Sequence, residues 1–481
     1  MSDYSKRPIL FLLTSHWVSM LGVALVTTAG FSWLFVLPIQ LRGHTSNPYI
    51  GIVVFILIPV VFILGLILIA LGIFLARRRI CSIEHDLLVS PDRRTYIRKL
   101  AIFFAVTTAA NIVIGTQGTY RAVEHMETPQ FCGQSCHVMK PEFTAHQNSP
   151  HARVECVDCH VAPGATGWVQ SKVAGTRQFI DTVFKRVHYP IESAMESNRL
   201  VPARETCERC HWPQMFDATK LRVIFHFKDD EANTQTQTAL MMLTGGGTLG
   251  GIHGKHLGPG VEIHYAAADP KRQTIPLVEY RNRSTGETHT FLADGSTVQS
   301  VAKLPRSQMQ CVDCHNRPTH TFERPERAVD NAMGLGDISP TLPFIKKKAI
   351  ELLKANYASN EVASRVIPEA LARYYQQSYP AIASQRPKDI ADAGSQIAAI
   401  YNRNVFPDLK VTWGTYPNDL GHTDFPGCFR CHDGSHSTSD QKLTIVQDCE
   451  ACHEPLAIEE TSPGVLKTLG LADRIASLQK R

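Results

Sequence analysis

Apolar residues are concentrated at the start of the chain, in three stretches. Residues 9–41 contain no Asp, Glu, Lys or Arg, and residues 50–75 form a second, more strongly apolar stretch. A third stretch, at about 100–117, is shorter and richer in Thr. Because a helix needs about 20 apolar residues to cross a bilayer, the pattern predicts three transmembrane helices. For the third stretch, a buried helix of a soluble domain is the alternative.

The charges that flank these stretches predict their orientation. Lys6 and Arg7 precede the first stretch, the 76–99 loop carries six Arg and one Lys, and only Arg42 lies between the first two stretches. Since positive charge stays on the cytoplasmic side, we expect a cytoplasmic N-terminus and an outer location for everything after about residue 118. The first stretch is too long for a signal peptide and is interpreted as an uncleaved anchor.

The rest of the chain has the pattern of a polar, folded protein. Residues 274–295 predict two strands joined at Ser-Thr-Gly-Glu. Residues 344–405 show helical periodicity with Pro breaks. The glycine-rich segment 244–260 lacks the Lys-Ser/Thr of a phosphate-binding loop, so we expect an irregular loop. The formal net charge of +5 is small, without a long basic run, and nucleic-acid binding is therefore not expected.

Cysteine is the residue type that needs an explanation. Of the 13 cysteines, all but Cys81 fall into six pairs, and a histidine directly follows each pair. Five pairs have two intervening residues, whereas the first has three. Numbered along the chain as motifs 1 to 6, the pairs and their histidines are Cys132/Cys136/His137, Cys156/Cys159/His160, Cys207/Cys210/His211, Cys311/Cys314/His315, Cys428/Cys431/His432 and Cys449/Cys452/His453.

Three kinds of chemistry use paired cysteines. A C-x-x-C pair can hold zinc or act as a redox dithiol, and in an exported domain it can form a disulfide. Neither role requires a histidine directly after the second cysteine. Covalent attachment of c-type haem does, because the thiols bond to the porphyrin and the adjacent imidazole binds the iron from one side. The six motifs therefore predict six c-type haems.

Six irons also need ligands on their opposite side, since ligand type helps to set the haem potential. We favour His146 and His151, which lie between two motifs, and next His188, His256, His320, His422 and His436. The glycine-rich segment is expected to bring His253 or His256 over a haem, whereas His289 lies in a predicted strand. The remaining candidates are His125, His226 and His264.

The region of the first three motifs resembles a known family. The residues ETPQFC at 127–132, CHVMKPE at 136–142, SPHARVECVDCHV at 149–161, Gly167-Trp168 and Lys172 are similar to NapC/NirT-type membrane quinol dehydrogenases. The resemblance covers roughly residues 100–211. It implies a protein that takes electrons from membrane quinol and passes them to periplasmic partners.

The resemblance also implies roles for single residues. Met139 matches a methionine that ligates the first haem in some members, and His151 matches a histidine that is a second ligand to another haem. Lys172 and Asp181 resemble a lysine and an acid near the quinol site, with Arg177 as a rival for the positive role. Glu142 and His125 are further candidates, beside Asp181, for accepting the quinol proton, because a general base must lie within hydrogen-bond reach.

The chain departs from the family in three ways. Motif 1 has three intervening residues, two apolar stretches precede the usual single anchor, and the chain continues well past the fourth motif. This longer plan resembles the larger NapC/NirT-like inner-membrane cytochromes of metal-respiring bacteria. The extra residue in motif 1 puts in doubt whether His137 or Met139 binds its iron.

These observations together predict three N-terminal transmembrane helices followed by a mainly helical and irregular multihaem domain with a small β element. The predicted segments are 1–117 in the membrane, 118–211 with three haems, 212–310 without haem and with a β hairpin, and 311–481 with three haems and a helical insertion. We expect a cytochrome of the bacterial inner membrane that oxidises menaquinol or another quinol from the quinone pool. Its acceptors would be periplasmic cytochromes or reductases. A terminal reductase of a small oxidant and an electron-relay subunit of a larger complex are the alternatives.

Overall fold

The computed structural model describes residues 16–19, 21–23, 25–27, 29–30, 56–79, 98, 117, 120–121, 123–135, 137–196, 200–212, 219–246 and 250–479. The chain divides into two compact units, residues 1–137 and 138–481, and each is considered by itself. The predicted third apolar stretch, apart from residue 117, and the unpaired Cys81 lie outside the described residues.

The first unit contains one long apolar helix. Helix α4 spans Ile58–Arg79, and within the described residues Ile58–Leu75 is the one helix long and apolar enough to cross a membrane. A shorter apolar helix covers Trp17–Thr27. The described residues therefore contain one of the three predicted membrane helices at full length. Near the end of the unit, the π-helical turn η4 (Phe131–Ser135) carries Cys132.

The second unit begins with short helices and little hydrophobic core. After the 3₁₀ turn η5 come α6, α7, the 20-residue α8, α9 and the 3₁₀ turn η6. Of the described apolar side chains between residues 140 and 211, only Pro141, Ala145, Val201 and Ala203 are buried. The bounds are η5 His137–Met139, α6 Lys140–Gln147, α7 Cys156–His160, α8 Gly164–Val183, α9 Ala203–Thr206 and η6 Cys207–Arg209.

Two antiparallel sheets follow, in the orders β1-β2-β9 and β6-β3-β4-β5-β7-β8. The predicted hairpin is present as β4 and β5, which pair Leu277 with Leu292 and Arg281 with Thr288. The β structure is larger than the small element expected, since strands from the C-terminal segment complete both sheets. The strands are β1 Lys220–Phe227, β2 Gln235–Met242, β3 Val261–Ala266, β4 Leu277–Asn282, β5 Thr288–Ala293, β6 Arg306–Gln308, β7 His436–Ser437, β8 Thr444–Ile445 and β9 His453–Glu460.

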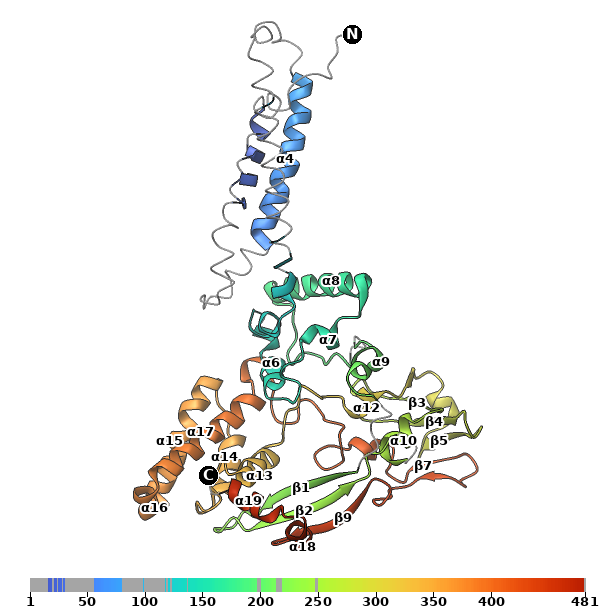
Figure 1. Cartoon of the computed structure of the whole chain (residues 1–481), viewed down its shortest axis with the longest axis vertical. Helices are drawn as coiled ribbons and strands as arrows, with labels where there is room; N and C mark the ends of the chain where they lie inside the picture. Colours follow the sequence, from blue (N-terminus) through green and yellow to red (C-terminus); the bar gives the residue numbers. More distant parts are fainter. Residues whose placement is uncertain are drawn as a thin grey trace. The chain divides into compact units, whose positions relative to one another are not determined.

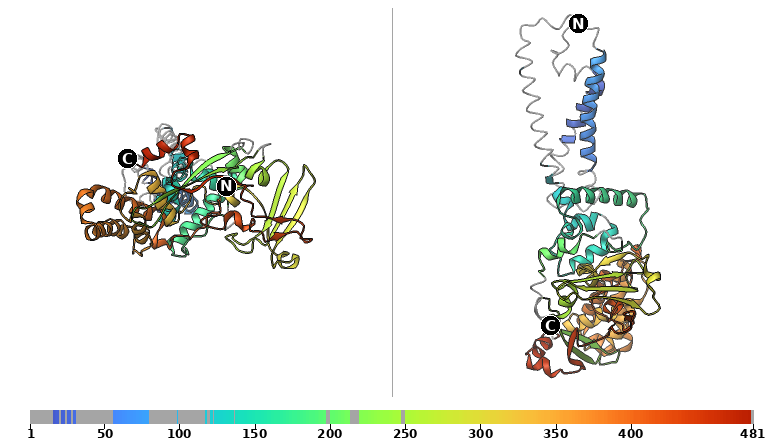
Figure 2. Two further views of the ribbon diagram at one scale, coloured as in Figure 1. Left: turned by 90° about the horizontal axis from the view of Figure 1, so that it is seen from below. Right: turned by 90° about the vertical axis from the view of Figure 1, so that its right-hand side faces the viewer.

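The largest hydrophobic core of the second unit lies among helices α13 to α17, where Leu353, Ile367 and Ile397 have no exposed surface. The sequence predicts these helices well, because both their periodicity and the residues that begin them are local features. The Ser359 hydroxyl accepts the N–H of Val362 at the start of α15, and proline begins α13, α16 and α17. Figure 1 shows α15, α16 and α17 gathered away from the six-stranded sheet, and Figure 2 shows the same separation within this unit. The bounds are α13 Pro325–Leu335, α14 Ile345–Lys354, α15 Asn360–Ser378, α16 Pro380–Gln385 and α17 Pro387–Asn404.

Short helical elements complete the second unit. Several of them carry residues of the cysteine motifs or the glycine-rich segment. They are α10 Gly251–Leu257, α11 Val298–Val301, α12 Cys311–Cys314, the 3₁₀ turns η8 Pro407–Leu409 and η9 Gly427–Arg430, and α18 Gly464–Thr468 and α19 Ala472–Leu478 near the end of the chain.

Candidate functional site

Each C-x-x-C-H motif closes into a helical turn. In motif 3 the backbone N–H of His211 donates to the carbonyl of Cys207 at 2.8 Å, and motifs 4, 5 and 6 repeat this bond at 2.8 to 3.0 Å. Motif 2 is itself the helix α7. Residues three and four positions apart share one face of such a turn. The two thiols and the imidazole of each motif therefore lie on the same side, as attachment to one porphyrin requires.

Motif 1 is wound differently, and this accounts for its additional residue. Cys132 lies in the π-helical turn η4, whose hydrogen bonds span five residues instead of four. A π turn accommodates one more residue than an α turn. His137 is the fifth residue after Cys132, one more than in the other motifs, and it begins the 3₁₀ turn η5 that follows. Cys136 itself lies outside the described residues.

Exposure separates the described motif cysteines into two groups. Cys210, Cys428 and Cys449 are exposed, whereas the other eight are only partly exposed. The sequence assigns Cys210 to haem attachment, but the structure leaves this residue exposed, unlike its motif partner Cys207. The reason is local, because Cys210 is the C-cap residue just after the 3₁₀ turn η6 and the described side chains around it do not cover it. Attachment of a haem at Cys210 therefore stays a prediction that rests on the motif and its turn, not on a buried thiol.

A second histidine faces the histidine of each of motifs 2 to 6. The ring centroids of every pair are about the same distance apart, although the interplanar angles range from stacked to edge-on. The pairs are His160–His320 at 6.2 Å, His211–His151 at 5.9 Å, His315–His253 at 6.2 Å, His432–His256 at 5.8 Å and His453–His422 at 6.3 Å.

This spacing fits two imidazoles on opposite sides of one metal ion. Two metal–imidazole bonds of about 2 Å place the ring nitrogens about 4 Å apart and the ring centroids about 6 Å apart. The eleven cysteines in the described residues form no disulfide. Across the same part of the chain, no group of three or more His, Cys, Asp or Glu is arranged to hold a metal. The arrangement fits haem better than zinc or a disulfide framework.

Backbone carbonyls orient two of the facing histidines. His253 and His256 lie three positions apart on α10, and their Nδ1 atoms contact the carbonyl oxygens of Thr244 at 2.7 Å and Ile252 at 2.8 Å. A bond from Nδ1–H to a carbonyl leaves Nε2 as the ligating nitrogen. Burial also lowers the pKa of His256, which keeps its imidazole in the neutral, ligating form.

The remaining facing histidines come from other segments. His151 lies between motifs 1 and 2, as the sequence argument favoured, and its Nδ1 atom is buried without a hydrogen-bond partner. His320 follows motif 4, and His422 precedes motif 5. The glycine-rich segment contributes both of its histidines, whereas we expected one. Their i, i+3 spacing, GIHGKHL, was the available signal that both lie on one helical face.

Three other favoured histidines are placed differently. The Nε2 atom of His436 bonds to the carbonyl of Ile275 at 2.7 Å, and its Nδ1 to Asp433 at 3.0 Å. His146 likewise has both ring nitrogens in hydrogen bonds, and its ring lies 6.4 Å from that of His320. His188 follows the end of α8 and faces no motif histidine among the described ring pairs. The hydrogen bonds of His146 and His436 occupy the nitrogens that a metal would need.

Glu142 is a buried partner of one facing histidine. Its Oε2 atom lies 3.1 Å from Nδ1 of His320, and its Oε1 lies 3.3 Å from Nη2 of Arg317. The Arg317 guanidinium stacks 4.2 Å from the Tyr416 ring centroid. Burial first, and then the positive charge of Arg317, lower the pKa of His320 to about 3. The sequence argument considered Glu142 as a proton acceptor for quinol, but its carboxylate is directed at His320.

Motifs that are neighbours in sequence are also neighbours in space. Burial first, and then the charges of Cys207, Asp158 and Cys210, raise the pKa of Cys159 in motif 2, which places both thiols of motif 3 near it. A hydrogen bond with the Cys311 thiol of motif 4 lowers the pKa of Cys207 to about 6.

The later motifs continue this arrangement. Burial and Cys428 of motif 5 raise the pKa of Cys314 in motif 4 to about 12. The same two causes raise the pKa of Cys452 in motif 6. Motifs 2 to 6 thus form an ordered series.

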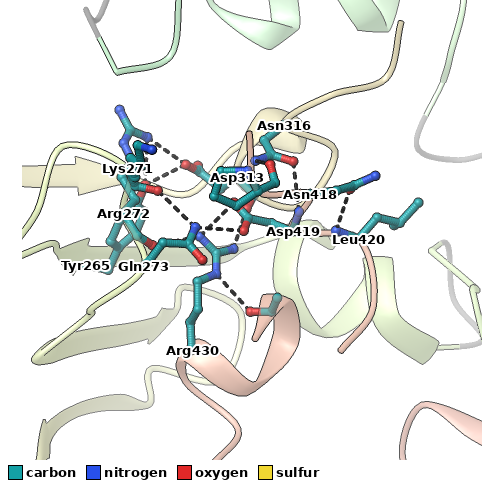
Figure 3. Close-up of polar contacts among 12 residues, drawn as sticks. Tyr265, Lys271, Arg272, Gln273, Asp313, Asn316, Asn418, Asp419, Leu420 and Arg430 are labelled. Atoms are coloured by element: carbon teal, nitrogen blue, oxygen red, sulfur yellow. Dashed lines mark hydrogen bonds and ion pairs between the residues drawn. The ribbon is translucent and has the colours of Figure 1, made fainter. Parts of the chain in front are cut away.

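A buried polar network joins motifs 4 and 5 (Figure 3). Its centre is formed by Asp313 and Arg430, the residues that lie between the cysteines of the two motifs. Arg430 donates to the Asp313 carbonyl at 2.6 Å and pairs with the buried Asp419 at 3.1 Å. Arg272 pairs with the Asp313 carboxylate at 2.7 Å. Charge pairs that are desolvated and hydrogen-bonded hold their geometry closely, so this network fixes the two motifs against each other.

The three residues expected at a quinol site all lie on α8. Lys172 and Arg177 border a shallow, open hollow on the surface of this helix, and Nζ of Lys172 lies 5.4 Å from the Trp168 ring centroid. Asp181 pairs instead with Arg177 at 3.9 Å. At 100° and 1.5 Å per residue, Lys172 and Asp181 lie on opposite sides of the helix and about 13 Å apart along it.

Comparisons with known proteins identify the family to which the chain belongs. Residues 94–241 match the model of a protein family described as "NapC/NirT cytochrome c family, N-terminal region". The cytochrome c-type protein ImcH of Geobacter sulfurreducens is 38% identical over 447 residues, covering 91% of this chain and 87% of that protein. The cytochrome c nitrite reductase subunit NrfH of Nitratidesulfovibrio vulgaris is 27% identical over 117 residues, covering 24% of this chain and 70% of that protein. No solved structure matches the chain significantly. The chain belongs to the NapC/NirT cytochrome c family.

Proposed function

We propose that this membrane-anchored cytochrome oxidises membrane quinol and delivers the electrons, through six covalently attached haems, to an acceptor outside the cytoplasmic membrane. Membership of the family implies membrane anchoring and covalently bound haem. The number of haems rests on the six motifs. The observation that carries the ligation of five of them is the set of five histidine pairs at 5.8 to 6.3 Å, each containing one motif histidine.

The chain's own residues would hold the haems as follows. The cysteines of the six motifs would attach them. His160, His211, His315, His432 and His453 would bind five irons from one side, and in the same order His320, His151, His253, His256 and His422 would bind from the other. For motif 1, His137 and Met139 are the candidate ligands. Each bound haem supplies a one-electron carrier.

The histidine pairs favour electron transfer over reduction of a small oxidant. A terminal reductase needs an iron with an open position at which its substrate binds. In motifs 2 to 6 a second imidazole stands where that substrate would have to bind. The arrangement therefore supports transfer along the series better than catalysis at one of these five positions. The match to a nitrite reductase subunit favours, as a second candidate, a relay subunit of a larger complex.

Quinol oxidation requires removal of two protons as well as two electrons. Lys172 and Arg177 line the hollow along α8, and their positive charge would stabilise the anion that forms when quinol loses its first proton. Asp181 lies on the other side of α8 from Lys172, beyond direct hydrogen-bond reach of a quinol in this hollow, so its role as the proton acceptor is the prediction that Asp181→Ala tests. The positive and the basic roles are therefore separable by single substitutions.

We propose that electrons pass from motif to motif in the order of the sequence. We place the N-terminus in the cytoplasm, three helices in the inner membrane and the haem domain in the periplasm, on the basis of the flanking charges. Electrons would enter at motif 1, which follows the membrane segments in sequence, and leave from motif 6. Cys449 of motif 6 is exposed, which suits contact with a periplasmic cytochrome or reductase.

The test is stopped-flow reduction of the purified full-length protein by a menaquinol analogue. We expect Lys172→Ala to slow reduction about tenfold, equal to about 1.4 kcal/mol, with all six haems retained in a pyridine haemochrome assay. If a deprotonated side chain accepts the quinol proton, the rate of haem reduction rises with pH. Asp181→Ala should remove this rise. Gln170→Ala, at an exposed position of the same helix, is the matched control.

Two results would redirect the proposal. Unchanged rates in both variants would keep quinol oxidation but move its site away from α8. If quinol reduces no haem while dithionite reduces all six, quinol oxidation is wrong and the relay subunit becomes the better proposal.

A further inference from the structure

We propose that α8 is an interfacial helix that lies flat on the outer surface of the bilayer, with one side embedded among the lipid acyl chains. Helix α8 and the residue after it expose a series of large apolar side chains. Val173 and Phe184 are each 65% exposed, and Val183 is 57% exposed. Within the described part of this 20-residue helix, only Gly167 is buried. The other exposed members are Trp168, Val169, Phe179 and Ile180.

The exposed apolar residues share one side of the helix. At 100° per residue, all seven fall within about 160° of the helical circumference. Gln170, Ala174, Gln178 and Asp181 occupy the opposite side. An apolar stripe of this width on a helix normally faces a core, and a contiguous apolar patch left exposed marks an interaction surface. Helix α8 therefore has the apolar stripe of a packed helix, and most of this stripe is exposed.

The charges around the stripe favour a phospholipid surface as the occupant. Lys172, Arg177, Lys185 and Arg186 lie on or directly after α8, against the single acidic residue Asp181. Basic residues beside an apolar stripe are typical of helices in the bilayer interface, where they meet lipid phosphates.

One basic and one aromatic side chain, Lys172 and Trp168, also favour a position in the bilayer interface. Lys172 lies on the apolar side of α8, and its ammonium group is held over the face of Trp168 at 5.4 Å. A lysine with its stem along an apolar surface can extend its charge to the headgroups. Tryptophan is enriched at this depth of the membrane because its ring is amphipathic.

The bilayer is favoured over a soluble protein partner because the chain carries its own membrane segment. Helix α4 is long and apolar enough to span, and the family is membrane-anchored. A tethered helix meets the membrane at a high effective concentration, so a modest interfacial affinity is enough to keep it bound. A small quinol would cover only part of a stripe that extends from Trp168 to Phe184.

The test uses the full-length protein in nanodiscs of phosphatidylcholine and phosphatidylglycerol, with a trace of phospholipid carrying a diazirine on its acyl chain. After photolysis, peptide mass spectrometry locates the lipid adducts. We expect adducts at Val169, Val173 and Ile180, and none at Gln170 and Gln178 on the opposite side. Absence of adducts on α8, or equal labelling of both sides, would overturn the proposal. Crosslinks from this stripe to a second copy of the chain would also overturn it.

A pair of variants sharpens the result. Val173→Glu combined with Ile180→Glu places two charges in the apolar stripe and should lower the adduct yield on α8 at least fivefold. Ala174→Glu, on the opposite side of the same helix, should leave it unchanged. Haem content and the visible spectrum report whether each variant is folded. The labelling does not depend on electron transfer, so a failure of quinol oxidation and a failure of the lipid contact are distinguishable.

Discussion

Two parts of the second unit are stabilised in different ways. Between residues 140 and 211, which hold two complete motifs, the buried apolar side chains among the described residues are Pro141, Ala145, Val201 and Ala203. Residues 325–405 hold no motif, and there Leu353, Ile367, Leu371 and many others are fully buried. The comparison shows where side chains make the core and where the proposed haems must make it.

The energetic consequence follows from the buried area. Full burial of a Leu or Ile side chain contributes about 1.5–3 kcal/mol, so the helical segment gains most of its stability from its own packing. The segment with two motifs has no comparable set of side chains. We infer that its porphyrins replace that core, and that the two parts respond differently to loss of haem and to truncation of side chains.

The largest expected effect is that of preventing haem attachment. In a variant with Cys156→Ala and Cys159→Ala, residues 140–211 should lose protection against amide hydrogen exchange, because the apolar surface of one haem is removed from a region with little else. Helices α15 and α17 should keep theirs. Equal loss in both parts would show that the helical segment does not fold on its own packing.

A substitution in the hydrophobic core of the helical segment should destabilise that segment and leave the segment with two motifs unchanged. Ile367→Ala removes a fully buried side chain from α15 and should lower the free energy of unfolding of the helical segment by about 2–5 kcal/mol. Far-UV circular dichroism during thermal unfolding measures this loss, while the visible haem spectrum should be unchanged. Glu369→Ala, on the outer side of the same helix, is the control and should change stability by less than about 0.5 kcal/mol.

Replacement of one proposed haem-ligating histidine should change one haem and leave both parts of the second unit folded. His253→Ala removes the imidazole that faces His315 at 6.2 Å, so electron paramagnetic resonance should show one low-spin haem converted to high spin. His289→Ala is the matched control, because His289 stacks on Tyr280 in the sheet. Conversion in the control and not in the variant would contradict the proposed pairing.

The smallest effect expected is a shift of one haem potential. Glu142→Gln removes a negative charge that lies 3.1 Å from Nδ1 of His320, and it leaves in place the main-chain carbonyl of residue 142, which accepts a hydrogen bond from that nitrogen at 3.0 Å. Charge near a haem ligand helps to set the haem potential, and loss of a negative charge favours the reduced form. The potential of the motif 2 haem should therefore rise by about 60 mV, which for one electron equals about 1.4 kcal/mol. Potentiometric titration followed in the visible spectrum measures it. Asp433→Asn, beside His436, should leave this potential unchanged.

Several features were predictable from the sequence because they depend on neighbouring residues. The motif turns are closed by bonds between residues four apart, the β4–β5 hairpin follows from alternation around a short turn, and the helices between residues 345 and 404 follow from periodicity and caps. The family was also recognisable from the residues around motifs 1 and 2. Two of the three predicted membrane helices, by contrast, have no full-length counterpart in the described residues.

Other features depend on residues far apart along the chain, and only the tertiary structure decided them. Each motif specifies its own histidine, whereas the facing histidine is selected by packing, as when His320 faces His160. Strands β7, β8 and β9 complete sheets that begin about 200 residues earlier, a pairing that no local pattern encodes. Local turns need only their own residues, but a ligand pair needs the whole fold to bring two imidazoles to one iron.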